Sequence, residues 1–154
     1  MWRMKTVDIE VRLATAQDRT SLEEFYRREG LDFHDLSSRP TISSGGKARE
    51  TMYIVAVAKG MVIAALKLDV VRDPRHGDIG QILHFEIEDA LESTDLGKQM
   101  LEETIELAQE KGLRALDAMI REERADVISL FLDSDFNEIH KEVTLRRYFR
   151  ERIF

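Results

Sequence analysis

The chain has 154 residues, of which 43% are apolar, and this is enough for a single domain over residues 1–154 with its own core. Each continuous apolar run is too short to span a membrane. A net charge of −7 argues against a nucleic-acid binder, whose surface would be basic. The lack of cysteine excludes disulfides and thiolate metal sites, and residues 1–5 lack the apolar core of a signal peptide, so we expect a cytoplasmic protein.

The N-terminal part predicts a strand followed by a helix. Residues 7–13 alternate between apolar and charged side chains, as in a strand with one buried side. After a polar turn, Thr20-Ser21-Leu22-Glu23 fits the capping box of a helix start. The apolar face of this helix would hold Leu22, Phe25 and Tyr26, and Gly30 would end it.

The next section predicts a connector and then three antiparallel strands. Residues 31–36 fit a short second helix, and residues 37–47, rich in Ser and Gly, predict a loop. Two β-rich runs, 52–58 and 61–71, flank the tight turn Lys59-Gly60, and a second turn at 72–78 leads into the following strand.

A strand, a turn and a helix follow one another between residues 82 and 112. Leu83, Phe85 and Ile87 alternate with His84, Glu86 and Glu88, which predicts a strand with these two sets on opposite faces. The period then becomes helical, and the apolar helix face would hold Gly97, Met100, Leu101, Thr104, Ile105 and Ala108. Free N–H groups at such a helix start form a natural anion site.

The last third predicts a strand, a helix and a final strand. Residues 113–120 complete a βαβ crossover with residues 82–88, so these two strands would be parallel neighbours. Residues 124–133 predict a helix with Phe131 on its apolar face, and residues 138–149 alternate like a strand.

This order of elements resembles that of the GNAT acetyltransferase superfamily over the whole chain. The opening VRLATAQDRTSLEEF is similar to the start of GNAT domains, and residues 92–97 lie where the family has its Q/R-x-x-G-x-G/A turn. Glu92 stands at the Q/R position of this motif, Asp95 stands where the family has the first glycine, and Gly97 matches the last glycine. The resemblance implies an α/β (α+β) fold with a mixed, mostly antiparallel sheet of six to seven strands and about four helices.

The resemblance also implies acetyl-CoA as cosubstrate. The diphosphate would lie at the turn and helix start, on Glu92, Asp95, Leu96, Gly97, Lys98 and Gln99. The pantetheine arm would lie along Phe85, Glu86 and Ile87, with Phe131 nearby, and residues 37–47 would close over the amine acceptor unless they are a plain solvated connector.

The base that accepts the amine proton would be Glu86, with His84 as second candidate. The alternative is that His84, Glu86 and Glu88 form only a solvated sheet surface. A His-x-Glu-x-Glu set could also hold a divalent metal, but a fourth ligand is not near in sequence, so we expect none.

The chain departs from the family pattern at the phosphate turn and in the last helix. Phe131 stands where many members carry a tyrosine that protonates the leaving thiolate, and Glu92 and Asp95 place two carboxylates beside a diphosphate, offset in part by Lys98. Two functions therefore remain: an N-acetyltransferase acting on an amine of a small molecule or protein, and a catalytically degenerate module that senses acyl-CoA or binds proteins.

The C-terminal run 145–154 combines strong β-formers with arginines, residue types enriched at interface cores. We expect a homodimer through this C-terminal strand, or else that Ile153 and Phe154 fold back onto their own domain.

Overall fold

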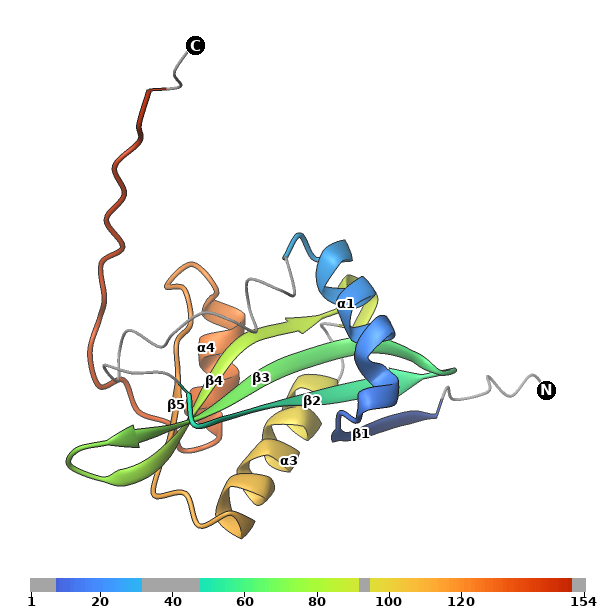
Figure 1. Cartoon of the computed structure of the whole chain (residues 1–154), viewed down its shortest axis with the longest axis horizontal. Helices are drawn as coiled ribbons and strands as arrows, with labels where there is room; N and C mark the ends of the chain where they lie inside the picture. Colours follow the sequence, from blue (N-terminus) through green and yellow to red (C-terminus); the bar gives the residue numbers. More distant parts are fainter. Residues whose placement is uncertain (1–7, 32–47, 92–94, 151–154) are drawn as a thin grey trace.

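The computed structural model describes residues 8–31, 48–91 and 95–150, which form one five-stranded sheet with helices on both faces (Figure 1). The expected residues 32–36 of the second helix, the loop 37–47, Glu92, Ile153 and Phe154 lie outside these ranges. The elements in chain order are β1 (Ile9–Leu13), α1 (Arg19–Arg28), β2 (Glu50–Ala58), β3 (Met61–Asp73), β4 (Gly77–Ile87), α3 (Leu96–Glu110), β5 (Leu116–Ala118) and α4 (Ala125–Asp133).

The sheet runs in the order β1-β2-β3-β4-β5, and its first four strands are antiparallel. β5 lies parallel to β4, and α3 forms the crossover between them. This arrangement confirms the α/β fold class, the run of three antiparallel strands and the βαβ unit.

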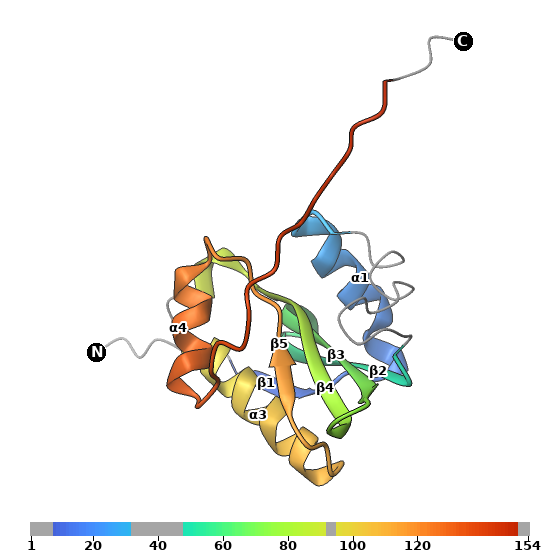
Figure 2. The same cartoon turned by 90° about the vertical axis from the view of Figure 1, so that its left-hand side faces the viewer.

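α1 lies on one face of the sheet and α3 and α4 lie on the other (Figure 2), and a hydrophobic cluster lies between each face and its helices. On one face, Met100 and Leu101 of α3 and Phe131 of α4 pack with alternate residues of β2 and β3, such as Leu66 and Leu68. On the other face, the expected α1 residues Leu22, Phe25 and Tyr26 pack with Val55, Val62 and Ala65. Because strand side chains alternate between faces, β2 and β3 contribute to both clusters; β3 is almost fully buried, and β2 is buried along its middle.

The helix start expected at Thr20 is wrong by two residues, because the N-cap of α1 is Asp18, and the capping box of Thr20 and Glu23 does not form. α1 begins at Arg19, and the Ser21 hydroxyl accepts a hydrogen bond from the Val62 N–H at 2.8 Å. The carboxylate that organises this turn is Asp18, which accepts a 2.7 Å hydrogen bond from the Thr15 N–H and pairs with Arg12.

The sheet is also smaller than expected. In the described residues it has five strands rather than six or seven, with three α-helices rather than about four. β5 contains three of the eight residues expected to form it, and residues 138–149 are not a strand at all. None of the helices in these residues is long and apolar enough to cross a membrane.

Candidate functional site

β4 contains a bulge in its second half, at His84 and Phe85. Lys67 of β3 lies opposite Leu83, and Ala65 lies opposite Glu86, so two β4 residues face the single residue between them on β3. His84 has a φ of 51°, a left-handed conformation that a histidine rarely adopts. The strand is therefore bent and twisted next to Glu86 and His84, the two residues that the sequence predicts as candidate bases.

The bulge shifts the alternation of side chains along β4. Ile82, Phe85 and Ile87 pack on the α3–α4 side, whereas Glu86 pairs with Ala65 and faces the α1 side. The expectation that Leu83 shares a face with Phe85 and Ile87 is therefore wrong, because the extra residue at the bulge changes the phase. Glu86 nevertheless lies on the face opposite Phe85 and Ile87, as expected.

A buried tyrosine of α1 supports the bulge. The Tyr26 hydroxyl donates a hydrogen bond to the backbone carbonyl of His84 at 3.0 Å, across 58 residues of sequence. Tyr26 is fully buried, and this burial raises the pKa of its phenol well above the usual value. The phenol consequently stays protonated and remains a hydrogen-bond donor at any physiological pH.

β4 and β5 separate just after they pair. Ladder pairing joins them only from Gly80–Leu116 to Ile82–Ala118, and residues 83–87 of β4 have no ladder partner on β5. The pairing thus ends next to the bulge, and we use "the opening between β4 and β5" for the stretch beyond Ile82 and Ala118 where the two strands are not paired. An extended ligand can add to such a strand edge through backbone hydrogen bonds.

The first turn of α3 lies at the same end of β4. A Cβ atom at Gly97 would lie 3.2 Å from Cδ1 of Ile87 and 3.1 Å from Cδ2 of Leu130, so the helix start is tightly packed between β4 and α4. Asp95 makes no side-chain cap, and Lys98 and Gln99 are exposed. The first turn of α3, with its positive dipole end, therefore lies beside Ile87 and the part of β4 that has no ladder partner on β5.

Glu86 has a cationic neighbour that sequence analysis missed. Nη1 of Arg124 lies 3.5 Å from Oε1 of Glu86, and the Glu86 side chain is 25% exposed. Arg124 occupies the position just before α4, where a cation is unfavourable to the helix dipole. The unfavourable position of Arg124 was the one feature of the sequence that could have indicated a carboxylate partner elsewhere. The 38 residues between Arg124 and Glu86 meant that local spacing could not identify that partner.

No family model matches the sequence, and no curated protein matches it either. Solved structures do match its fold. An aminoglycoside N-acetyltransferase, AAC(6')-Iy in complex with CoA, superposes with a TM-score of 0.73 over 95% of this chain and 99% of that one, at 13% identity. The ribosomal-protein-alanine N-acetyltransferase of Brucella melitensis biovar Abortus 2308 gives 0.70 over 90% and 99%, at 15% identity.

A transcriptional regulator from Bacillus halodurans C-125 matches equally well, with a TM-score of 0.70 over 91% of this chain and all of the other, at 16% identity. The chain has the GNAT acetyltransferase fold. At these identities the similarity is one of fold, so the functional assignment depends on the residues of the site.

Phe131, at the GNAT tyrosine position, is a core residue. It is 3% exposed, and its ring lies between those of Phe85 at 6.1 Å and Phe136 at 4.9 Å, both edge-to-face. Phe131 therefore supports the bulge from the α4 side and brings no hydroxyl to it. Its contact with a cofactor, like those of the other expected site residues, stays a prediction.

The α1 face of this GNAT sheet also contains a buried ion pair that sequence analysis missed. Lys67 and Asp69 of β3 are 2% and 1% exposed, with Nζ and Oδ2 3.5 Å apart. Thr51 donates to Asp69 at 2.8 Å, and burial, followed by the charge of Asp69, raises the pKa of Tyr53 to about 12. Two opposite charges at i and i+2 inside an apolar strand were the signal that could have revealed the pair.

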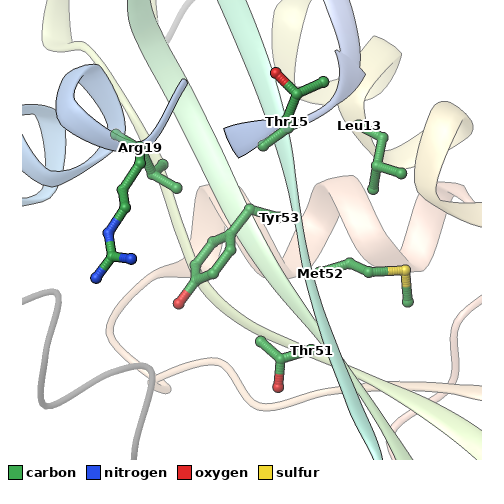
Figure 3. Close-up of a pocket in the computed structure, with 8 residues that line it drawn as sticks. Leu13, Thr15, Arg19, Thr51, Met52 and Tyr53 are labelled. Atoms are coloured by element: carbon green, nitrogen blue, oxygen red, sulfur yellow. The ribbon is translucent and has the colours of Figure 1, made fainter. Parts of the chain in front are cut away.

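A cavity of about 210 Å³ lies away from the bulge, where β1 ends beside β2 (Figure 3). Leu13, Arg19, Thr51 and Tyr53 are among the residues that line it. It is separated from β4 by the width of β3, so it does not coincide with the opening between β4 and β5. Residues 8–31, 48–91 and 95–150 contain no cluster of three His, Asp or Glu side chains suited to a metal ion.

Proposed function

We propose that the chain is an acetyl-CoA-dependent N-acetyltransferase whose site is the opening between β4 and β5. One observation carries the proposal: the bulge at His84 and Phe85, the end of β4–β5 pairing and the first turn of α3 all meet at one place. Together they provide an anion site, a strand edge and a carboxylate within one short stretch of chain.

Each part of the site suits one part of acetyl-CoA. The start of α3 would bind the diphosphate through its positive dipole end and the N–H groups of Gly97 and Lys98, with the Lys98 side chain adding positive charge; the Gln99 N–H already donates to the Asp95 carbonyl at 3.0 Å. The β4 edge at residues 85–87 would hydrogen-bond the amide groups of the pantetheine arm. The thioester would then lie beside the bulge, near Glu86.

Acetyl transfer requires a base on the face of the sheet where the amine substrate would bind. The amine nitrogen attacks the thioester carbonyl carbon, the N–C bond forms, the C–S bond breaks and CoA leaves as a thiolate. Glu86, on the α1 face, takes the proton that the nitrogen loses, and Arg124 at 3.5 Å orients its carboxylate. His84 remains the second candidate for this role.

Because Phe131 is buried and has no hydroxyl, the thiolate would have to leave without protonation by a tyrosine. This is chemically feasible because thiols have a pKa of about 8.5, so a thiolate is a stable leaving group near neutral pH. The solved structures support the reaction class, since two of them are named as N-acetyltransferases and one contains CoA. Their named acceptors differ, and we propose an amine of a small molecule or protein for this chain.

A second function, binding of acyl-CoA without acetyl transfer, is favoured by the two positions at which the chain differs from the GNAT pattern. Phe131 has no hydroxyl and is 3% exposed, and Asp95, the N-cap residue whose side chain makes no cap hydrogen bond, places a carboxylate at the proposed anion site. Such a protein would sense acyl-CoA or bind another protein.

Calorimetric titration with acetyl-CoA and with CoA, combined with an assay of thiol release over a panel of amines, tests both functions. Binding with amine-dependent thiol release supports the transferase. Binding without release for any amine supports the sensing module. A folded chain that binds neither nucleotide at millimolar concentration contradicts both.

A further inference from the structure

The ion pair of Glu86 and Arg124 spans the opening between β4 and β5. Glu86 lies on β4 beyond Ile82, the last β4 residue that pairs with β5. Arg124 ends the connection that leaves β5 after Ala118, and it is the N-cap residue of α4. Because Nη1 of Arg124 lies 3.5 Å from Oε1 of Glu86, the guanidinium group lies where the thioester of acetyl-CoA would react.

Arg124 is the least exposed charged side chain of the connection. Its side chain is 33% exposed, against 82% for Arg121, which pairs with Glu123 at 3.7 Å. Glu122 is 87% exposed and pairs with Lys141 at 3.8 Å. Solvent screens these surface pairs, whereas a partly buried charge acts more strongly on its neighbours. Arg124 is therefore the cation of this connection best placed to act on a group in the opening.

The departing thiolate needs either a proton or a nearby positive charge. The two buried aromatic residues that support the bulge are poor sources of a proton. Phe131 has no hydroxyl, and the Tyr26 hydroxyl donates to the His84 carbonyl at 3.0 Å and is fully buried. A guanidinium group is always charged and has five N–H donors, so it can hold Glu86 with one donor and turn others to sulfur.

We propose that Arg124 is a catalytic residue that stabilises the departing CoA thiolate, in place of the tyrosine that many GNAT members carry. This inference rests on the proposed function. As the amine nitrogen bonds to the carbonyl carbon, the electron pair of the C–S bond moves to sulfur, which becomes an anion. Glu86 takes the proton that the nitrogen loses and becomes neutral. The positive charge of Arg124 thus passes from the carboxylate to the thiolate in the same step.

The thiol of bound CoA reports the charge of Arg124 without any amine acceptor. Since the chain has no cysteine, this thiol is the only one in the complex. A thiol in water has a pKa of about 8.5, and we expect the pKa of bound CoA to be lower by about one unit, a tenfold change in its ionisation constant. A pH titration of the thiolate absorbance with excess protein measures it, with the desulfo-CoA complex as the blank.

Arg124→Gln should return the pKa of the bound thiol to about 8.5 or above, and Arg124→Lys, which keeps the charge, should retain part of the lowering. Arg121→Gln is the matched control, because it removes an exposed arginine from the same connection. It should leave the pKa of the thiol within about 0.3 unit of the parent value. Equal effects of Arg124→Gln and Arg121→Gln would overturn the inference.

The Glu86→Gln background separates a direct effect of Arg124 from one that acts through Glu86. Loss of Arg124 also leaves the Glu86 carboxylate without this cation, which by itself raises the pKa of a nearby thiol. In the Glu86→Gln chain, Arg124→Gln should still raise the pKa of bound CoA by at least about half a unit. Loss of the effect in that background would show that Arg124 acts only through Glu86 and would overturn the inference.

The same titration distinguishes failure of this inference from failure of the proposed function. A parent chain that binds CoA, with a thiol pKa that Arg124→Gln leaves unchanged, overturns the role of Arg124 alone. A folded parent chain that does not bind CoA overturns the proposed function and the role of Arg124 together.

Discussion

At the scale of single residues, Glu86 is the side chain on which the proposed reaction depends most. It projects from β4 just after the bulge, on the α1 face. Glu86→Gln removes the proton acceptor and keeps the side-chain shape, so kcat should fall by about two to four orders of magnitude with CoA affinity retained. Measuring thiol release and CoA binding on the same preparation separates the two effects.

Glu88 provides a matched control for this test, because it is an exposed glutamate two residues along. Glu88→Gln should leave kcat within about twofold of the parent chain. Unchanged turnover in Glu86→Gln would transfer the role of base to His84 or to a water molecule.

Asp18 makes a two-point contact with the guanidinium group of Arg12. Both of its oxygens accept hydrogen bonds from Arg12, Oδ1 at 2.8 Å, and Asp18 is 9% exposed. The Arg12 hydrogen bonds hold the pKa of Asp18 well below its usual range. Ionised Asp18 therefore stabilises the fold above a pH of about 4, its unfolded pKa, and that stabilisation is lost as the pH falls further.

Asp18→Asn should consequently lower the free energy of unfolding by about 1–3 kcal/mol at neutral pH and flatten its fall between about pH 5 and pH 2. Urea denaturation at a series of pH values measures this. Asp8→Asn, which removes an exposed carboxylate, should leave the profile as in the parent chain. Equal slopes in Asp18→Asn and the parent would contradict the assignment.

At the scale of elements, β3 contains the buried pair Lys67 and Asp69. Lys67→Ala would leave the carboxylate of Asp69 unpaired at 1% exposure, and the free energy of unfolding should fall by about 3–5 kcal/mol. Replacing both, as Lys67→Met with Asp69→Leu, should recover much of the loss, since no charge then remains buried.

The surface pair of Lys111 and Glu50 gives a control with similar geometry, 3.1 Å apart but 31% and 51% exposed. Lys111→Ala should cost less than about 1 kcal/mol by urea denaturation. If the two lysine variants had the same effect, burial would not determine the strength of the β3 pair.

Sequence patterns predicted the elements that are determined locally. The hairpin around Lys59-Gly60, the α3 face with Met100 and Leu101 and the βαβ crossover all follow from local periodicity and turn chemistry. The bulge was not predictable, because the left-handed His84 is supported by the hydroxyl of Tyr26, a contact made only after α1 packs on the sheet.

The candidate site was predicted in part for the same reason. Glu86, Asp95 and Gly97 are brought to the same end of β4, as local order implied, whereas Arg124 reaches Glu86 from 38 residues away. The strand expected at 138–149 needs a neighbour that the described single chain does not supply, and alternation alone cannot show whether a neighbour exists.

At the scale of the whole molecule, the CoA site that we propose at the start of α3 would couple ligand binding to stability. Binding of CoA to the folded state alone should stabilise it by about 2.7 kcal/mol at a hundred times the dissociation constant, which raises the melting temperature of a domain of this size by about 5–10 °C. Pantetheine, which lacks the diphosphate, should give a much smaller shift. That difference isolates the contribution of the anion site.

Charge at the helix start should tune this shift in both directions. Lys98 is exposed, so Lys98→Glu should reduce the rise in melting temperature caused by CoA without changing the melting temperature of the free protein by more than about 2 °C. Asp95→Asn should increase that rise by removing the repulsion between a carboxylate and the diphosphate.

Gly97 is unsuitable for this purpose, because its added Cβ would press on Leu130 and Ile87 at 3.1–3.2 Å and disturb the core directly. Lys111→Glu, at the other end of α3, makes the same charge change as Lys98→Glu and should leave the CoA shift intact. If CoA and pantetheine shifted the melting temperature equally in all these proteins, the diphosphate would not bind at the start of α3.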